Sequence, residues 1–214
     1  MWNTILFDLD GTLTDPKEGI TRAVAIALEG FGVHEDPERL THFIGPPLDE
    51  SFPEFYGFTP EQTAAATEAF RVYFAAQGWR ENVPYPGMAA LLGELKAAGR
   101  RLVVATSKPE VFAVRILEHF DLAKYFDHIC GAPMDNQEGA KKAAVIRSAL
   151  SRAGVGDLSS AVMVGDRRHD IAGAHETGLR AIGVLYGYGD RAEHERAGAD
   201  FIAADLDELR GLLL

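Results

Sequence analysis

Short, almost entirely apolar runs recur along the chain and alternate with segments of helical periodicity. The runs that predict buried strands are residues 5–7, 102–105, 161–164, 181–185, 201–202 and, more weakly, 128–130. Apolar residues at helical spacing occupy residues 88–95 and 143–150, and a glycine follows each pattern. Strands that are apolar on both faces are typical of a parallel sheet covered by helices on each side. The pattern therefore predicts an α/β fold, with a Rossmann-like parallel sheet core and helices on both faces.

A long segment interrupts this alternation immediately after the first strand. One helical face of the segment is formed by Ile20, Val24, Leu28 and Phe31. Thr59, followed by a proline and then by Gln62, is typical of a helix start with a capping box, and the helical pattern continues to Ala76. No strand pattern is visible before the stiff Pro-Tyr-Pro-Gly linker through which the chain returns. We expect two domains: an α/β catalytic core of residues 1–15 and 84–214, and a small all-helical cap inserted as residues 16–83.

Composition and charge narrow the range of partners. The 214 residues include 21 basic and 32 acidic side chains, for a formal net charge of -11. Because binding a polyphosphate needs an excess of Lys and Arg, this balance disfavours nucleic acid and anionic membranes. The lone Cys130 excludes an internal disulfide and a cysteine-based zinc site, and it is expected in the core. No apolar run is long enough for a membrane span and no signal peptide is visible, so we expect a cytoplasmic protein.

Polar side chains follow three of the expected strands. Asp8 and Asp10 follow the first, Thr106 the second, and Asp166 and Asp170 the strand at 161–164. Each residue alone is compatible with a helix cap or a turn, but the carboxyl ends of parallel strands meet at one edge of a sheet. Four carboxylates at one edge would repel one another and have raised pKa values unless a cation lay among them. Oxygen donors without paired histidines favour Mg2+.

These segments resemble the motifs of the haloacid dehalogenase superfamily of phosphotransferases. Residues 7–13 (Phe-Asp-Leu-Asp-Gly-Thr-Leu) resemble its first motif, residues 103–107 its second and residues 164–170 its fourth. The third motif is a lone lysine, for which Lys142 fits best and Lys141 is the rival. The resemblance spans the chain, because the helical insert is similar to the cap of the phosphoglycolate phosphatase-like branch.

The resemblance implies a role for each of these residues. Asp8 is expected to attack phosphorus and Asp10 to act as general acid and base. Mg2+ would be held by Asp8, the Asp10 carbonyl and Asp166, with Asp170 binding it directly or through water. The expected phosphate-binding residues are Gly11, Thr12, Thr106, Ser107 and Lys142. Lys108 and Arg167 lie close in sequence to the second and fourth motifs, so each could also take part in the function.

One segment of the insert resembles the substrate-facing loop of the family's cap. Residues 43–48 contain Gly45, Pro46 and Leu48, which are the expected substrate-facing residues. The same sequence is also compatible with a plain Gly-Pro turn between two helices.

The expected function is Mg2+-dependent hydrolysis of a small, soluble phosphomonoester, phosphoglycolate-like, through an aspartyl phosphate. The alternatives are a 5'-nucleotidase or pyrophosphatase of the same superfamily and, less favoured, a sugar phosphomutase. A phosphonoacetaldehyde hydrolase uses a cap lysine to form a Schiff base, and Lys17, the only lysine of the insert, leaves this alternative open. A dehalogenase normally lacks the second aspartate of the first motif, so Asp10 argues against that activity. A phospho-acceptor signalling domain is disfavoured, because its acceptor aspartate follows a later strand. The sequence leaves both a monomer and a homodimer open.

Overall fold

The computed structural model describes residues 2–134 and 137–214. It divides the chain into two compact units, Met1–Asp15 with Pro84–Leu214, and Pro16–Val83. Each unit is described below by itself. No helix in the described part of the chain is long and apolar enough to cross a bilayer.

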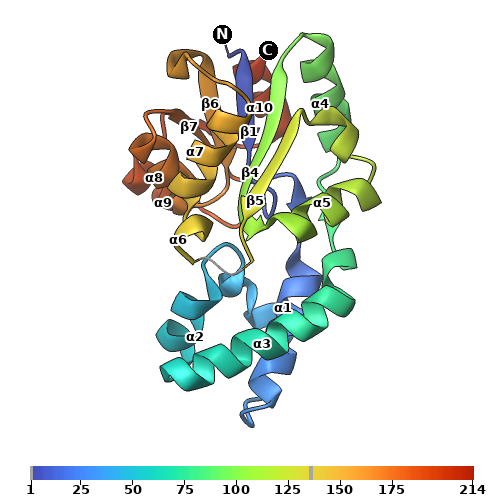
Figure 1. Cartoon of the computed structure of the whole chain (residues 1–214), viewed down its shortest axis with the longest axis vertical. Coiled ribbons are helices and arrows are strands. Elements are labelled where there is room, and N and C mark those ends of the chain that lie inside the picture. Colours follow the sequence, from blue (N-terminus) through green and yellow to red (C-terminus); the bar gives the residue numbers. More distant parts are fainter. Residues whose placement is uncertain (1, 135–136) are drawn as a thin grey trace. The chain divides into compact units, whose positions relative to one another are not determined.

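The first unit is built around a six-stranded parallel sheet, shown in Figure 1. In spatial order its strands are β5 (His128–Ala132), β4 (Arg101–Pro109), β1 (Thr4–Phe7), β6 (Ala161–Gly165), β7 (Arg180–Val184) and β8 (Phe201–Ala203). All five neighbouring pairs are parallel. The expected parallel α/β core is confirmed, including the weakly indicated strand β5.

The central strand β1 pairs with a strand on each side. Leu6 lies opposite Val103 of β4 and Met163 of β6, and all three side chains are fully buried. Burial on both faces explains why the central strands are apolar at nearly every position and show no alternation with polar residues.

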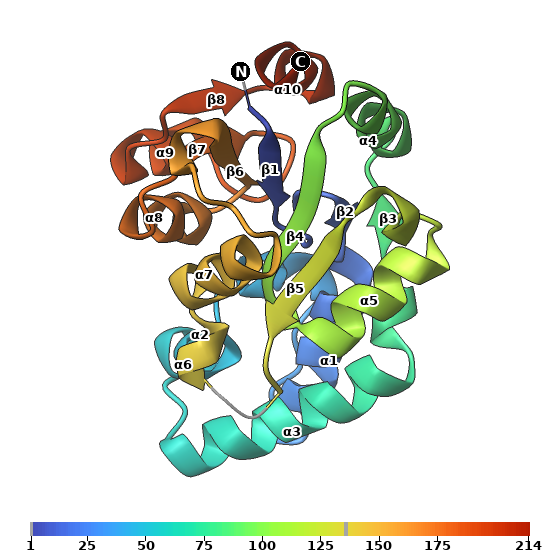
Figure 2. The ribbon, with the colours of Figure 1, turned by 45° about the horizontal axis from the view of Figure 1, so that its top comes forward.

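Helices cover both faces of this sheet, as Figure 2 shows. One face carries α4 (Met88–Ala97), α5 (Glu110–His119) and α10 (Leu206–Leu213), and the other carries α7 (Lys142–Arg152), α8 (Arg168–Glu176) and α9 (Arg191–Ala197). Helices that connect parallel strands lie on the faces of the sheet, which accounts for this cover on both sides. The core beneath α7 and α8 includes the expected buried Cys130. Shorter helical elements are η4 (Ala123–Tyr125), α6 (Gln137–Ala140) and η5 (Leu158–Ser160).

The second unit is helical. Its elements are α1 (Lys17–Glu29), η1 (Pro37–Arg39), η2 (Thr41–Phe43), α2 (Leu48–Tyr56), α3 (Pro60–Ala76) and η3 (Gly78–Arg80). The expected capping box opens α3: the Thr59 hydroxyl accepts the Gln62 amide at 3.3 Å, and the Thr59 amide donates to the Gln62 side chain at 2.9 Å. At Gly19 of α1, an added Cβ would lie 2.1 Å from the Gly78 carbonyl oxygen, so this close approach requires glycine.

The expectation that residues 16–83 contain no strand residue is wrong at one position. Val83 belongs to β3 (Val83–Pro84), which pairs with β2 (Thr14–Asp15) in a two-stranded sheet. Two-residue strands flanked by prolines have too little hydrophobic alternation to be visible in a sequence.

A close contact between a glycine and a buried histidine holds α9 against β7. An added Cβ at Gly183 would lie 2.7 Å from Cγ of His194, whose ring is fully buried and whose Nε2 lies 3.1 Å from the Val184 carbonyl oxygen. We expect Gly183→Ala to lower the free energy of unfolding by about 1–3 kcal/mol through overpacking, as measured by urea denaturation.

The matched control is Gly156→Ala. Gly156 is exposed and an added Cβ there meets no atom within 4 Å, so its effect should stay within about 0.5 kcal/mol. Equal stability of the two variants would contradict the overpacking argument.

Candidate active site

Polar side chains gather at the carboxyl edge of the sheet, around β1. Asp8 directly follows β1, Asp166 directly follows β6, and Thr106 lies near the end of β4. From β1 the chain proceeds to β4 and β5 on one side and then crosses to β6 on the other. Such a reversal of strand order opens a crevice at the carboxyl edge, which is where ligands bind in open parallel sheets.

Three buried carboxylates form the centre of the site. Asp8, Asp166 and Asp170 each place a carboxylate oxygen within 4.8 Å of the others. Asp170 reaches the cluster from the first turn of α8, where its Oδ2 accepts the Arg167 amide at 3.0 Å. Burial, with the neighbouring carboxylates, raises the pKa of Asp166 well above its usual value. Burial likewise raises the pKa of Asp170 to about 6, although Lys142 opposes the shift.

Lys142 bridges two of these carboxylates. Its Nζ lies 2.7 Å from Asp8 Oδ1 and 2.7 Å from Asp170 Oδ1, and it donates to the Ala105 carbonyl oxygen at 3.1 Å. Burial acts to lower the pKa of Lys142, but the carboxylates of Asp170 and Asp8 raise it above the ordinary value. Lys141 is exposed at the residue preceding α7. Of the two candidate lysines, the structure thus brings Lys142 to the carboxylates.

Asp166 lies in a tight cradle. Its Oδ1 accepts the Thr12 hydroxyl at 3.3 Å, and its Oδ2 accepts the Tyr188 amide at 2.8 Å. A Cβ added at Gly11 would lie 2.1 Å from Asp166 Oδ2, and one added at Gly187 would lie 2.6 Å from it. Both loops therefore need glycine in order to approach this carboxylate.

The donor set of the cluster suits a hard divalent cation. Asp8, Asp166 and Asp170 offer only oxygen, and they form the one such group found among the described residues. Buried carboxylates that lie this close together gain stability when a cation shares them. Their chemistry therefore fits Mg2+.

The Asp10 side chain belongs to a second ion pair. Its Oδ2 lies 2.6 Å from Nζ of Lys108, and the side chains of the two residues are 14% and 6% exposed. Burial raises the pKa of Asp10, against the opposing effect of Lys108. Its other oxygen, Oδ1, is buried without a hydrogen-bond partner in the part of the chain that the structure describes.

The remaining expected phosphate-binding residues lie around the ends of β1 and β4. Gly11 has φ +79° in the turn after β1, where its amide donates to the Thr14 carbonyl oxygen at 2.8 Å. The Thr12 amide donates within the same turn, to Leu9 at 3.2 Å. Thr106 is buried and Ser107 is half-buried. These residues therefore lie at the carboxyl edge of the sheet, and the Gly11 and Thr12 amides donate hydrogen bonds within the turn.

The expected substrate-facing residues belong to the second unit. Gly45 has φ +104° and connects η2 to α2, Pro46 is half-buried, and Leu48 begins α2 and is half-buried. Lys17 of this unit forms an ion pair with Glu38 at 2.6 Å.

Two residues with contacts at this edge, Tyr188 and Glu193, were not predicted from the sequence. Tyr188, in the glycine-rich loop after β7, donates its amide to Asp166, and its hydroxyl donates to Asp15. Glu193 of α9 accepts from Arg167 Nε at 3.0 Å and from the Arg168 amide at 2.7 Å. The only available signal was position, because a glycine-rich loop after another parallel strand, β7, also lies at the carboxyl edge.

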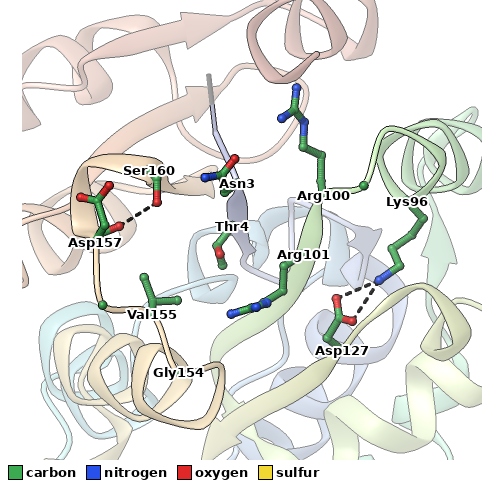
Figure 3. A pocket seen from close by; sticks show the side chains of 12 residues that line it. Asn3, Thr4, Lys96, Arg100, Arg101, Asp127, Gly154, Val155, Asp157 and Ser160 are labelled. Atoms are coloured by element: carbon green, nitrogen blue, oxygen red, sulfur yellow. Dashed lines mark hydrogen bonds and ion pairs between the residues drawn. The ribbon is translucent and has the colours of Figure 1, made fainter.

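A separate hollow lies at the opposite edge of the sheet, where the strands begin (Figure 3). Its volume is about 440 Å³, and its lining includes Thr4 of β1 and Arg101 of β4. Lys96 and Asp127 pair with each other on its wall at 2.9 Å. None of the predicted site residues lines this hollow.

Comparison with known proteins agrees with this arrangement. Residues 5–184 match the family model of the haloacid dehalogenase-like hydrolases. A 5'-nucleotidase from Pseudomonas aeruginosa is 43% identical over 98% of this chain and 94% of its own length. The tyrosine-protein kinase PtkA of Mycobacterium tuberculosis is 38% identical over 98% of this chain and 72% of its own. A phosphoglycolate phosphatase from Caulobacter vibrioides is 32% identical over 93% and 85%.

A solved structure shows the same fold. The crystal structure of a predicted phosphatase from Clostridium acetobutylicum superposes with a TM-score of 0.95 and 46% identity, covering 100% of this chain and 98% of that chain. Together with the family match, which spans all the motifs, this confirms the resemblance and the expectation of an enzyme. The chain belongs to the haloacid dehalogenase-like hydrolase family.

Proposed function

We propose that the protein is a Mg2+-dependent phosphatase that hydrolyses a small phosphomonoester through a phosphorylated Asp8. The observation that carries this proposal is the bridge from Lys142 to Asp8 and Asp170 beside Asp166. It holds one buried carboxylate in a fixed place and supplies positive charge where a phosphate would arrive. A nucleophile needs that fixed position, and an anionic substrate needs that charge.

In the first half-reaction Asp8 forms a bond to phosphorus. The bond between phosphorus and the ester oxygen breaks, and its electron pair goes to that oxygen. Asp10 gives the ester oxygen a proton, so that an alcohol departs and Asp10 becomes ionised. The ammonium group of Lys142, with the Thr106 hydroxyl and Ser107, would stabilise charge on the non-bridging oxygens.

In the second half-reaction water attacks phosphorus and gives a proton to Asp10. The bond between Asp8 and phosphorus breaks, which returns the Asp8 carboxylate and releases inorganic phosphate. Bound Mg2+, held by Asp8, Asp166, the Asp10 carbonyl and Asp170, would supply charge neutralisation and orientation. Asp170 would bind directly or through water.

Two classes of substrate are the leading candidates. Phosphoglycolate-like esters match the branch that the sequence motifs and the cap indicate, and a relative 32% identical bears the name phosphoglycolate phosphatase. Nucleoside 5'-monophosphates are the second candidate, because a relative that is 43% identical is named a 5'-nucleotidase. The net charge of -11 supports a small substrate over a polynucleotide.

Asp8→Asn tests the nucleophile. The amide keeps the shape of the side chain but cannot attack phosphorus, so turnover should fall by several orders of magnitude. Steady-state rates on purified protein with Mg2+ measure this, and circular dichroism checks the fold. Asp207→Asn, at an exposed aspartate paired with Arg210, is the matched control and should leave the rate unchanged. Retention of more than about a tenth of the wild-type rate by Asp8→Asn would refute covalent catalysis through Asp8.

Chelation tests the metal. Removal of divalent ions should abolish turnover, Mg2+ should restore it, and Ca2+ should inhibit it. Calcium accepts more ligands in a looser geometry, so it would hold Asp8 at an angle unsuited to attack. Rates measured with each ion after dialysis against a chelator decide the matter. Full activity in excess chelator, or equal support by Ca2+, would rule the proposal out.

A panel of small phosphate compounds separates the roles of cap and core. Leu48→Ala should change the order of preference among 2-phosphoglycolate, nucleoside 5'-monophosphates, pyrophosphate and sugar phosphates, mainly through KM. Thr106→Ala should lower kcat for every substrate alike, by about 10²- to 10³-fold, since it removes a donor to the phosphoryl oxygens. Val72→Ala, at an exposed position of α3, is the control within the same unit.

The panel also includes larger phosphorylated substrates and an assay for phosphoryl transfer, and each can contradict the proposal. Faster turnover of a phosphorylated protein or a polynucleotide than of every small ester would contradict the small-substrate proposal. Transfer of phosphate from ATP to a tyrosine peptide, without hydrolysis of any ester, would contradict the phosphatase assignment.

A further inference from the structure

Lys108 is a buried lysine with a direct contact to the proposed acid and base. Its side chain is 6% exposed, and its Nζ lies 2.6 Å from Asp10 Oδ2. Taking an ammonium group out of water is costly unless a partner compensates it. Asp10 is therefore a partner that stabilises Lys108 in this position.

The backbone that carries Lys108 is held firmly. The pairing of β4 with β5 shifts register between Thr106 and Pro109, and the Lys108 amide donates to the Thr106 hydroxyl at 3.2 Å. On the other strand, a Cβ added at Gly131 would lie 2.7 Å from the Lys108 carbonyl oxygen. The irregular end of β4 is thus fixed from two sides, which fixes the start of the long lysine side chain.

The two oxygens of Asp10 have different surroundings. Lys108 holds Oδ2, whereas Oδ1 is buried and accepts no hydrogen bond from any residue that the structure describes. Lys142, by contrast, contacts Asp8 and Asp170. Lys108 therefore contacts the proposed acid and base, whereas Lys142 contacts the proposed nucleophile.

We propose that Lys108 is a positioning residue that orients the Asp10 carboxyl group, so that Oδ1 exchanges the proton with the ester oxygen and then with water. This inference rests on the proposed function. In the first half-reaction the phosphorus–ester oxygen bond breaks as Asp8 bonds to phosphorus, and the proton passes from Asp10 Oδ1 to the departing oxygen. Lys108 transfers nothing; it holds Oδ2 throughout.

The test compares two esters of nearly the same shape. p-Nitrophenyl phosphate has a leaving group that departs without much need of a proton, whereas phenyl phosphate depends more on one. Because kcat/KM covers the steps up to departure of the alcohol, it reports the proton transfer separately from hydrolysis of the phosphorylated Asp8. Positioned proton transfer is typically worth about 10²- to 10⁴-fold.

We expect Lys108→Met to lower kcat/KM for phenyl phosphate by about 10²-fold and for p-nitrophenyl phosphate by less than about threefold. Lys108→Arg, which keeps a cation near Asp10, should recover most of the difference between the two esters. Lys96→Met is the matched control, because Lys96 also pairs with an aspartate, Asp127, but at the opposite edge of the sheet. It should leave both values unchanged.

A double-mutant cycle with Asp10→Asn makes the test independent of any general loss of activity. If Lys108 acts through Asp10, adding Lys108→Met to Asp10→Asn should cause no further loss that depends on the leaving group. Should Lys108→Met fail to fold by circular dichroism, Lys108→Gln enters the same comparison.

Equal losses on both esters, no loss, or additive losses in the cycle would overturn the inference, because they would indicate phosphate binding or a purely structural role. Failure of the proposed function would look different: the wild-type protein with Mg2+ would hydrolyse neither ester. An active wild-type protein with equal losses in Lys108→Met removes the inference alone.

Discussion

The site depends on one constraint, the crowding of buried carboxylates at one edge of a sheet. Asp8, Asp166 and Asp170 place oxygens within 4.8 Å of one another, and the three residues are 8%, 0% and 1% exposed. Such a group is unfavourable without compensation, since like charges repel and burial disfavours ionisation. The ion pairs of Lys142 with Asp8 and Asp170, both at 2.7 Å, supply part of the compensation. The unfavourable energy that remains is seen in the raised pKa values of Asp166 and Asp170.

The fold meets this constraint with backbone geometry. Three parallel strands end side by side, which brings together residues that lie far apart in the sequence. Glycines at 11 and 187 let two loops approach Asp166 more closely than any residue with a Cβ would permit. Lys142 stands at the first turn of α7, where a one-residue shift would turn its side chain about 100° around the helix.

The parallel core could be predicted from the sequence, because strands buried on both faces are apolar at nearly every position. The motifs placed Asp8, Asp166 and Asp170 at one edge of this sheet, and the structure brings their carboxylates within 4.8 Å of one another. The sequence favoured Lys142 but kept Lys141 as a rival, because the choice depends on where α7 begins, and helix ends are the least certain part of a sequence pattern. The structure brings Lys142 to Asp8 and Asp170. The pair of Asp10 with Lys108, and the amide of Tyr188 on Asp166, arise from loop geometry that periodicity does not encode. Val83 was missed for the related reason that a two-residue strand has no period.

The charges of the site lead to a final argument about what it must bind first. Four aspartates, Asp8, Asp10, Asp166 and Asp170, face two lysines, Lys108 and Lys142, so full ionisation leaves two negative charges unbalanced. A phosphate dianion would meet repulsion there. A divalent cation brings this balance to neutral and removes the repulsion. When Asp10 carries the proton that it would give to the ester oxygen, the site has one net positive charge, which attracts the phosphate. The order of binding would follow from this balance, with the cation before the ester.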